Sequence, residues 1–429
     1  MAVNGEKSKD GRYIGALVAV GVCIQIPILA AFLTLLGYFW LSSLPAPPSV
    51  ITLLPLPGGL ILTIIVWLLL ALLFRPLATA EGGKLSDYEI FQGNLNVLHA
   101  QFKAIQSKAN DDKAQSATPT ELDKIAIAEI QSNFDDIDKM LNRDGLTWVL
   151  RTGYINLWDR LNKADEAMID VMPSMQVIEG TNYDILSLTD SKVPNNKDLI
   201  KQLQTAISTL SSDPNRFKQS SEQNNAVEPS GSSTTTNSKE QEARSSIRQV
   251  RAALHRYTNE RWDALVRARN KLMGTALLTN VLTFISVDVA ILVRVPAVTL
   301  ERISLFYLLG AIVGLFSQMI NESNAADAGI FDMDDYGLKG SRILVTPLLS
   351  GLAALVGVLL TTMLSIVLTT TISHGPTNFP LEDIYNFNMY PQNLVFAAVF
   401  GYLPSLVVGL LKQQVNKIQS EIHSSGPAA

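Results

Sequence analysis

Apolar residues gather in six runs along the chain, separated by polar segments of very different lengths. A helix that spans a bilayer needs about 20 mostly apolar residues, and the second, fourth and sixth runs are slightly shorter than this. The first run is far longer than the apolar part of a secretory signal, which has about 7–15 residues. The pattern predicts six membrane spans, at Tyr13–Leu41, Leu56–Phe74, Leu272–Val293, Ile303–Ile320, Ile343–Leu368 and Leu394–Leu411.

The long polar segment between the second and third runs carries apolar residues spaced three and four apart. This spacing places one apolar stripe along each helix, and no convincing strand pattern competes with it. We predict three helices here, a short helix at 195–210 and a helical stalk, which together form an antiparallel bundle of four or five helices. The three stripes consist of Phe91, Leu95, Leu98, Phe102 and Ile105; Ile127, Ile130, Phe134, Ile137 and Leu141; and Leu150, Tyr154, Leu157, Leu161, Ala164, Met168 and Val171.

Breaks between these helices are marked by residues that favour turns or helix starts. Thr118–Glu121 reads Thr-Pro-Thr-Glu, with proline at a first-turn position. Asp144–Gly145 and Met172–Pro173 interrupt the helical spacing. Residues 213–238 are rich in Ser, Thr, Asn and Gln, so we predict a flexible linker there.

One helix signal runs without interruption from the polar insert into the third apolar run. No proline occurs between Pro229 and Pro296, and Gly274 is the one glycine between residues 231 and 296. Arg261 falls on the stripe of the stalk, where it is either solvated or paired with a carboxylate that sets the register. The stripe of this charged first half, 238–271, consists of Ile247, Val250, Leu254, Tyr257, Arg261, Ala264 and Ala268.

The basic residues fall mostly on one side of the predicted membrane. Those on the other side are Arg294 and Arg302. Because loops rich in Lys and Arg stay in the cytosol, we expect both termini and the insert to be cytosolic. The basic residues on that side are Lys7, Lys9, Arg12, Arg75, Arg267, Arg269, Lys271, Lys339, Arg342, Lys412 and Lys417.

These patterns predict an all-α fold: a polytopic membrane helix bundle of six spans with a cytosolic antiparallel helical-bundle insert between spans two and three. The expected parts are a cytosolic N-terminus, a transmembrane hairpin, the cytosolic helical domain, a transmembrane bundle and a cytosolic tail. Their respective ranges are 1–12, 13–74, 75–271, 272–411 and 412–429.

The composition agrees with a multi-pass integral membrane protein. Of the 429 residues, 47% are hydrophobic and 17% are charged, whereas soluble domains contain about 25% charged residues. The net charge of −5 argues against nucleic acid as a partner. The partners we expect are the lipid bilayer, anionic lipid, and a second copy or another protein bound through the cytosolic helices.

No motif indicates catalysis, a cofactor or a metal. The chain contains no GxGxxG, P-loop, HExxH or GxSxG pattern, Cys23 is its single cysteine, and its four histidines are far apart. Asp332–Gly337 resembles the start of an EF-hand loop, but Ile343 occupies the twelfth position, where a glutamate is needed. We therefore expect no catalytic residue, cofactor or metal, and lean against an enzyme.

Polar residues within the apolar runs are the first candidates for a functional site. A charge at the centre of a span costs about 2.5–3.5 kcal/mol on insertion scales, so such residues are often functional. Asp288 either reaches interfacial water or pairs with Arg294 or Arg302, or it lines an ion or proton path. Asn280, Gln318 and Gln25 are either hydrogen-bonding contacts between helices or part of the same path.

Two basic clusters on the stalk are further candidates. Arg244, Arg248 and Arg251, followed by His255, are spaced four, three and four apart and share one face. They either pair with acidic neighbours or bind an anionic ligand. The second cluster lies beside the membrane, where it is either an orientation signal or a contact for anionic lipid. It consists of Arg267, Arg269 and Lys271.

Small residues recur at spacings that let helices approach closely. They serve either packing within the chain or contact between copies, and Pro404 and Pro27 could kink their helices. The small residues are Gly310, Gly314, Ala397, Gly401, Ser405 and Gly409.

The predicted function is a sensor or scaffold whose cytosolic domain is coupled to the membrane bundle by the continuous helix. The alternative is a small ion or solute channel or transporter that uses Asp288 and its polar neighbours.

Overall fold

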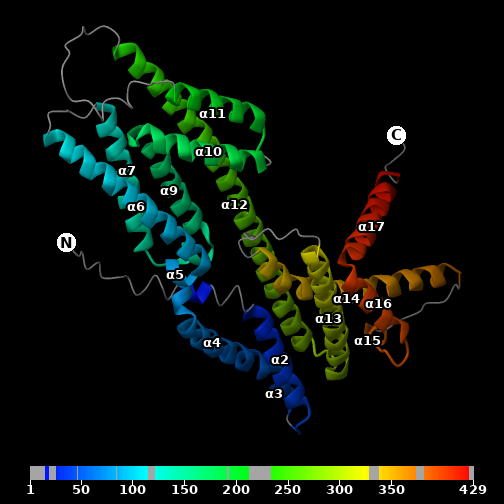
Figure 1. Cartoon of the computed structure of the whole chain (residues 1–429). Coiled ribbons are helices and arrows are strands. Elements are labelled where there is room, and N and C mark those ends of the chain that lie inside the picture. The colour runs from blue at the N-terminus through cyan, green and yellow to red at the C-terminus, as the bar shows by residue number, and fades with distance from the viewer. Residues whose placement is uncertain are drawn as a thin grey trace, which may run out of the picture. The chain divides into compact units, whose positions relative to one another are not determined.

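The computed structural model describes residues 15–18, 26–45, 47–83, 85–114, 121–190, 193–211, 233–327, 338–372 and 381–424. All regular structure in these ranges is helical, with no strand among them (Figure 1). The all-α class is therefore confirmed. The chain divides into two compact units: unit 1 comprises Met1–Ala16 and Phe74–Val266, and unit 2 comprises Leu17–Leu73 and Arg267–Ala429.

The described part of unit 1 contains six longer helices and three short helical segments. One of the six, α12, continues into unit 2. The elements are η1 (Arg75–Ala78), α5 (Ala80–Gly83), α6 (Leu85–Ala114), α7 (Glu121–Leu141), α8 (Leu146–Val149), α9 (Thr152–Val171), α10 (Ser174–Asp190), α11 (Asn196–Ser211) and α12 (Ser233–Leu292).

The hydrophobic core of unit 1 is built from the predicted stripes. Phe91 of α6, Ile130 of α7, Leu157 of α9 and Ile247 of α12 are fully buried and belong to one cluster. Phe134 packs against this cluster from α7 as well. The predicted spacing thus identified the core-facing side of each of these helices.

Helix α10 was not predicted, because half of its buried stripe is polar. The buried positions Val177, Thr181, Asp184 and Leu188 are spaced four, three and four apart. The Thr181 hydroxyl donates to the Val177 carbonyl oxygen, and Asp184 accepts from Arg251. Polar groups with such partners can occupy core positions, but a search for apolar spacing does not find them.

The predicted breaks at Asp144–Gly145 and Met172–Pro173 are confirmed. Gly145 has φ 146° and ψ −164°, a region that essentially only glycine adopts, and its N–H donates to the Ala78 carbonyl oxygen. Met172 has an extended backbone between α9 and α10, as expected before a proline. The helix α12 begins at Ser233, inside the predicted linker, whose residues 213–232 lie outside the described residues.

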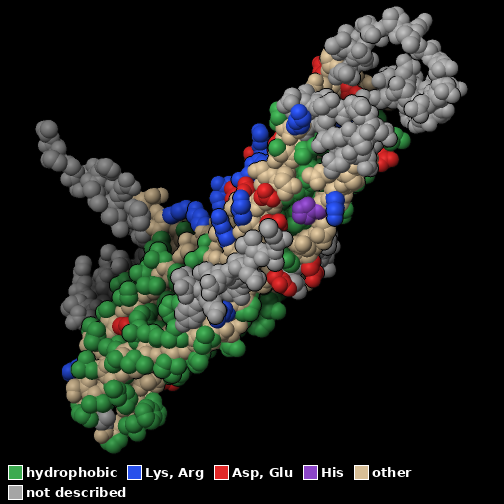
Figure 2. Space-filling view, turned by 90° about the vertical axis from the view of Figure 1, so that its left-hand side faces the viewer, with side chains coloured by type: hydrophobic (Ala, Val, Ile, Leu, Met, Phe, Trp, Pro, Cys, Tyr) green, Lys and Arg blue, Asp and Glu red, His purple; other side chains and the backbone are tan. Residues whose placement is uncertain are grey.

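Unit 2 contains the apolar helices, whose large side chains are mostly exposed in the described structure. Figure 2 shows these hydrophobic side chains as a broad green surface. The elements are α2 (Ile26–Ser42), α3 (Pro48–Leu53), α4 (Pro55–Leu73), the last part of α12, α13 (Ala297–Asp327), α14 (Leu338–Ile372), α15 (Leu381–Ile384), α16 (Gln392–Tyr402) and α17 (Pro404–Ser424).

Four helical stretches of the described chain are long and apolar enough to cross a membrane, and a bent pair would make a fifth. The expected number of six is therefore supported only as four or five. The first predicted span is described as helix at 15–18 and in the 17 residues of α2, while residues 19–25 lie outside the described ranges.

The sixth predicted span is broken in the structure. Its two halves, α16 and α17, are bent by 98° at Leu403. Pro404 has no N–H for the next helical hydrogen bond, so it ends the preceding helix. The 11 residues of α16 rise only about 16 Å, which is short of the roughly 30 Å hydrocarbon layer. Leu394–Leu411 is therefore not one straight span.

Packing within unit 2 fixes the direction of its helices. Leu272 of α12 packs near the start of α14, beside Val345, and near the start of α2. Ile291 at the end of the same helix packs against Leu300 at the start of α13 and Tyr38 at the end of α2. The helices α2 and α14 and the apolar half of α12 thus start at one end of unit 2, and α13 starts at the other.

The helix α12 is continuous over 60 residues, a length of about 90 Å. No break occurs between Lys271 and Gly274. The predicted stripe holds as far as Tyr257, which packs on the core. Beyond it, Arg261, Ala264 and Ala268 are exposed, so the buried face of the helix turns away from the predicted stripe.

Candidate functional site

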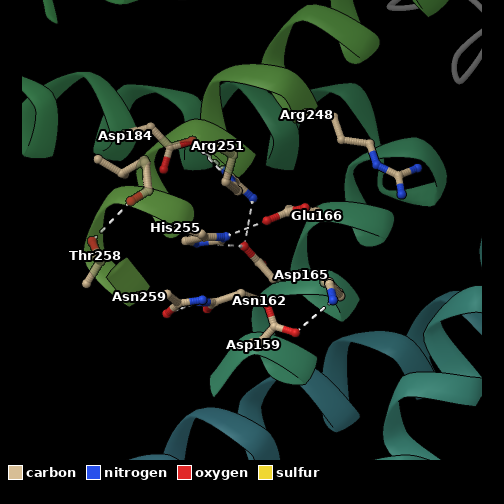
Figure 3. A network of polar contacts seen from close by, with 12 residues as sticks. Asp159, Asn162, Asp165, Glu166, Asp184, Arg248, Arg251, His255, Thr258 and Asn259 are labelled. Carbon is tan, nitrogen blue, oxygen red and sulfur yellow. Dashed lines mark hydrogen bonds and ion pairs between the residues drawn. The ribbon is translucent and has the colours of Figure 1, made fainter. Parts of the chain in front are cut away.

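The most elaborate polar site in the described residues is an ionic network in unit 1 (Figure 3). Its cationic side comes from α12, on which Arg244, Arg248, Arg251 and His255 share one face because helical positions three and four apart are neighbours. Its carboxylates come from α7, α9, α10 and α12 itself: Glu129, Asp165, Glu166, Asp170, Asp184 and Glu240.

Arg251 occupies the centre of the network. Its Nε and Nη2 donate to one oxygen of Asp184 at 2.9 and 2.8 Å, and Nη1 donates to Asp165 at 3.3 Å. The side chains of Arg251 and Asp184 are only 9% and 10% exposed. Gly180 makes room for this guanidinium, since a Cβ there would lie 2.9 Å from Nη2.

Burial and pairing act in opposite directions on these two groups. Burial raises the pKa of Asp184, and the positive charge of Arg251 offsets only part of that rise. Burial alone would lower the pKa of Arg251, but the carboxylates of Asp165 and Asp184 outweigh it and raise the pKa. Arg251 is therefore fixed in its charged form, while Asp184 ionises at a cost.

The remaining arginines tie α12 to other helices. Arg248 donates to both carboxylate oxygens of Glu129 on α7, at 2.8 and 2.9 Å, and to Asp170 on α9 at 2.6 Å. Arg244 bonds to Glu240 one turn away and to the carbonyl oxygens of Ile169 and Met172 at the end of α9. Bonds of this charge-assisted kind are about twice as strong as neutral ones.

His255 lies between two open hollows of the surface. Its Nδ1 is 2.9 Å from Glu166, and its Nε2 is 4.0 Å from Asp165. A hollow of about 430 Å³ lies between α9 and α12, and one of about 530 Å³ is bordered by α9, α10 and α12. Because His255 borders both hollows, water can reach it from two sides. The whole network thus contains six carboxylates, three guanidinium groups and this histidine.

The structure brings three predicted site residues, Arg244, Arg248 and Arg251, together with carboxylates that the sequence analysis did not single out. This arrangement agrees with the interpretation of a paired face, and binding of an anionic ligand there stays a prediction. The key missed residue is Asp184. Its one sequence signal is its position on the buried stripe of α10, three residues after Thr181 and four before Leu188.

The second basic cluster belongs to a different part of the chain. Arg267 and Lys271 are exposed on α12 at the beginning of its apolar half. Arg269 is only 7% exposed and donates to Asn270. Contact of this cluster with anionic lipid stays a prediction.

The polar residues of the apolar helices do not form one group. Asn280 is fully buried on α12, and Asp288 has a buried carboxyl oxygen that makes no hydrogen bond to the described residues. Gln318 on α13 donates to Glu322 at 2.9 Å, and Gln25 lies outside the described residues. A path that joins them stays a prediction.

The small residues divide at the break before Pro404. Gly310, Gly314, Ala397 and Gly401 are buried between α13, α14 and α16, and a Cβ on Gly401 would lie 2.6 Å from the Gly310 Cα. Ser405 and Gly409 are exposed on α17. Packing within the chain thus explains the first four, and contact between copies stays a prediction.

No family model, curated protein or solved structure matches this chain. No group of three His, Cys, Asp or Glu side chains suited to a metal ion occurs among the described residues. The class that fold and site define is thus an all-helical protein with several apolar helices and a second helical unit held by an ionic network.

Proposed function

We propose that this chain is a multi-pass integral membrane protein that acts as a sensor or scaffold. In this proposal unit 2 lies in the bilayer and unit 1 is a cytosolic domain, with both termini in the cytosol. The observation that carries the proposal is the continuity of α12, whose first part supplies the ionic network of unit 1 and whose last part is an apolar helix of unit 2.

The ionic network supports a sensing role, because it gives α12 several discrete bonds to other helices. Arg248 holds α12 to α7 and α9, and Arg251 holds it to α9 and α10. A ligand or partner that altered these pairs would change the forces on α12 itself. Continuity alone is not coupling, since coupling requires an element that both sites bias.

Coupling can be tested without a known ligand. A polarity-sensitive fluorophore on Val289→Cys, an exposed position in the apolar half of α12, would report on unit 2 in reconstituted full-length protein, with Cys23 replaced by serine. We expect Arg251→Gln to shift its emission, and Ala264→Pro to abolish that shift because proline interrupts the helix. Ala264→Ser is the matched control and should keep the shift.

The result that would contradict this proposal is equally direct. If Arg251→Gln left the emission unchanged while altering the helices of unit 1, α12 would be an anchor without a coupling role. If the shift survived Ala264→Pro, its route would not be α12. Membrane orientation is tested separately, by the reaction of a cysteine at Gly231 with an impermeant reagent from the cytosolic side alone.

A second candidate function is an ion or solute channel or transporter, and one observation favours it. The carboxyl group of Asp288 has a buried oxygen without a hydrogen bond to the described residues, and polar groups within membranes often mark transport paths. Flux through proteoliposomes that disappears in Asp288→Asn would support this function. An absence of flux in the wild-type protein would refute it.

A further inference from the structure

Four exposed basic residues lie at one end of unit 2, on two helices that pack together. Arg267 and Lys271 are one turn apart on α12, and Lys339 and Arg342 are one turn apart on α14. The start of the apolar half of α12 packs against α14 through a shared cluster, with Leu272 and Ala276 beside Val345 and Leu348. That contact brings both basic pairs to the same end of the unit, although they are far apart in sequence.

Each basic pair immediately precedes an apolar stretch of its helix. Lys271 is followed by Leu272, and Arg342 is followed by Ile343. The pairs span about 6 and 4.5 Å along their helices, and the headgroup layer on each side of a bilayer is roughly 5–8 Å thick. If unit 2 is embedded as proposed above, all four charges fall within the headgroup layer.

One residue between the two basic positions of each pair faces the interior. Arg269 and Ser341 are nearly completely buried, while the four basic side chains are exposed. One carboxylate near these residues is Glu322, whose Oε2 lies 3.9 Å from the Lys339 Nζ, and the lysine side chain is 50% exposed. Such an exposed pair contributes little to stability.

We infer that these four residues form a binding site for the phosphate of an anionic phospholipid headgroup, bridging α12 and α14. This inference rests on the proposed membrane embedding and names a partner for the same end of α12. It extends the predicted lipid contact from a stretch of one helix to a site made by two. Figure 2 shows Lys and Arg side chains gathered along the edge of the hydrophobic surface.

The connecting segment before α14 adds an opposing charge that the test must accommodate. Asp332, Asp334 and Asp335 precede Lys339 in sequence and lie outside the described residues. If these aspartates neutralise the basic pairs, the protein will show no preference for anionic lipid. A measured preference for anionic lipid cannot come from the aspartates, because their negative charge repels it.

The test measures which lipids the full-length protein retains. Purified protein is reconstituted into nanodiscs that contain equal amounts of phosphatidylglycerol and phosphatidylcholine, and bound lipids are counted by native mass spectrometry after release. We expect preferential retention of phosphatidylglycerol. Each basic residue near an anionic surface contributes about fivefold in affinity, so Lys271→Gln/Arg342→Gln should lower this preference roughly 25-fold.

Unit 1, which the proposal places outside the bilayer, supplies a matched control. Lys139→Gln/Arg160→Gln removes the same number of charges from exposed side chains of that unit and should leave the preference unchanged. Lys271→Arg/Arg342→Lys keeps the charges and should also behave as wild type, and unchanged helix content by circular dichroism verifies folding. If the first double variant does not fold, Lys271→Gln alone should still lower the preference about fivefold.

Three outcomes would overturn the inference. The first is equal retention of both lipids by the wild-type protein. The second is an equal loss in the control variant of unit 1. The third is binding of inorganic phosphate without any lipid preference, which would assign the site to a free anion. A protein that does not enter any bilayer would refute the proposed function as well, so the two failures are distinguishable.

Discussion

Removing the central cation of the network gives the sharpest test of how unit 1 is held together. Arg251→Leu retains only the apolar stem out to Cδ and leaves Asp184, only 10% exposed, and Asp165 without their guanidinium partner. Breaking a buried pair by removing one member typically costs about 3–5 kcal/mol, because a buried charge is left uncompensated. Asp165 is 27% exposed, so water screens its share and the lower part of this range is expected.

The assay is amide hydrogen exchange of the full-length protein in detergent, read from peptides of α9, α10 and α12. A loss of about 3 kcal/mol corresponds to exchange faster by a factor of a hundred or more, since about 1.4 kcal/mol is a factor of ten. The double variant Arg251→Leu/Asp184→Leu should recover part of the loss, because it removes both buried charges.

The matched control is Arg160→Leu, which removes a cation from the same unit. Arg160 lies 3.5 Å from Asp136, and both side chains are more than a third exposed. Exposed pairs contribute about 0–1 kcal/mol, so this variant should exchange nearly as the wild type does. The reasoning is refuted if the two variants lose protection equally, or if Arg251→Leu accelerates exchange by less than tenfold.

Three further predictions concern packing, backbone conformation and pH. Gly401→Val should lower the melting temperature in detergent, because overpacking costs about 1–3 kcal/mol. Gly409→Ala should not lower it, because nothing lies within 4 Å of the added Cβ. Equal effects of the two variants would contradict the packing described. Gly145→Ala should destabilise unit 1 by about 1–3 kcal/mol, because φ of Gly145 is 146°. Gly93→Ala lies in open space on a helix and should stabilise unit 1 by about 0.5–1 kcal/mol. Hydrogen exchange measures both effects, and the same sign for both would contradict backbone strain at Gly145. Burial raises the pKa of Asp184 above 3.8, so the native state holds the carboxyl proton more tightly than the unfolded state does. The stability of the wild-type protein relative to Asp184→Asn should therefore fall as pH rises above about 4. If hydrogen exchange shows that this stability difference stays constant or rises with pH, burial of Asp184 is not its cause.

The sequence predicted the helices of unit 1 wherever their buried stripe is apolar. Phe91, Ile130 and Leu157 are buried as the three-and-four spacing requires. It missed α10, because Thr181 and Asp184 occupy core positions there. Thr181 bonds to Val177 within α10, but the burial of Asp184 depends on Arg251, which a helix more than sixty residues away supplies. Spacing within one helix contains no information about that partner.

In unit 2 the apolar runs were predicted, but the sequence indicated six spans where the described structure supports four or five. Hydropathy measures how apolar a stretch is and does not show where its backbone bends. Pro404 was recognised as a residue that could kink a helix, yet the 98° angle at Leu403 also depends on how α16 packs against α13 and α14. The close approach of Gly310 and Gly401 likewise joins residues whose partners could not be assigned from one sequence.

The ionic network was predicted only from its basic side. Arg244, Arg248 and Arg251 stand out because they lie on one face of a helix with no competing acidic residue among them. Their partners come from three other helices as well as α12, and single carboxylates on those helices look like ordinary surface residues. Pairing across helices is a property of tertiary packing, which the spacing along one chain does not specify.

Among the helices of unit 1, α12 comes last along the chain, and this order has a consequence for biosynthesis. Residues of α6 to α11 leave the ribosome first, but their core lacks Ile247 and Val250, and their carboxylates lack the arginines of α12. A nascent chain that ends before Ser233 therefore exposes apolar surface and uncompensated charge, which favours aggregation or chaperone binding. The domain can close only as the apolar half of α12 follows, so the completion of its fold and the emergence of that apolar segment fall at nearly the same moment of synthesis.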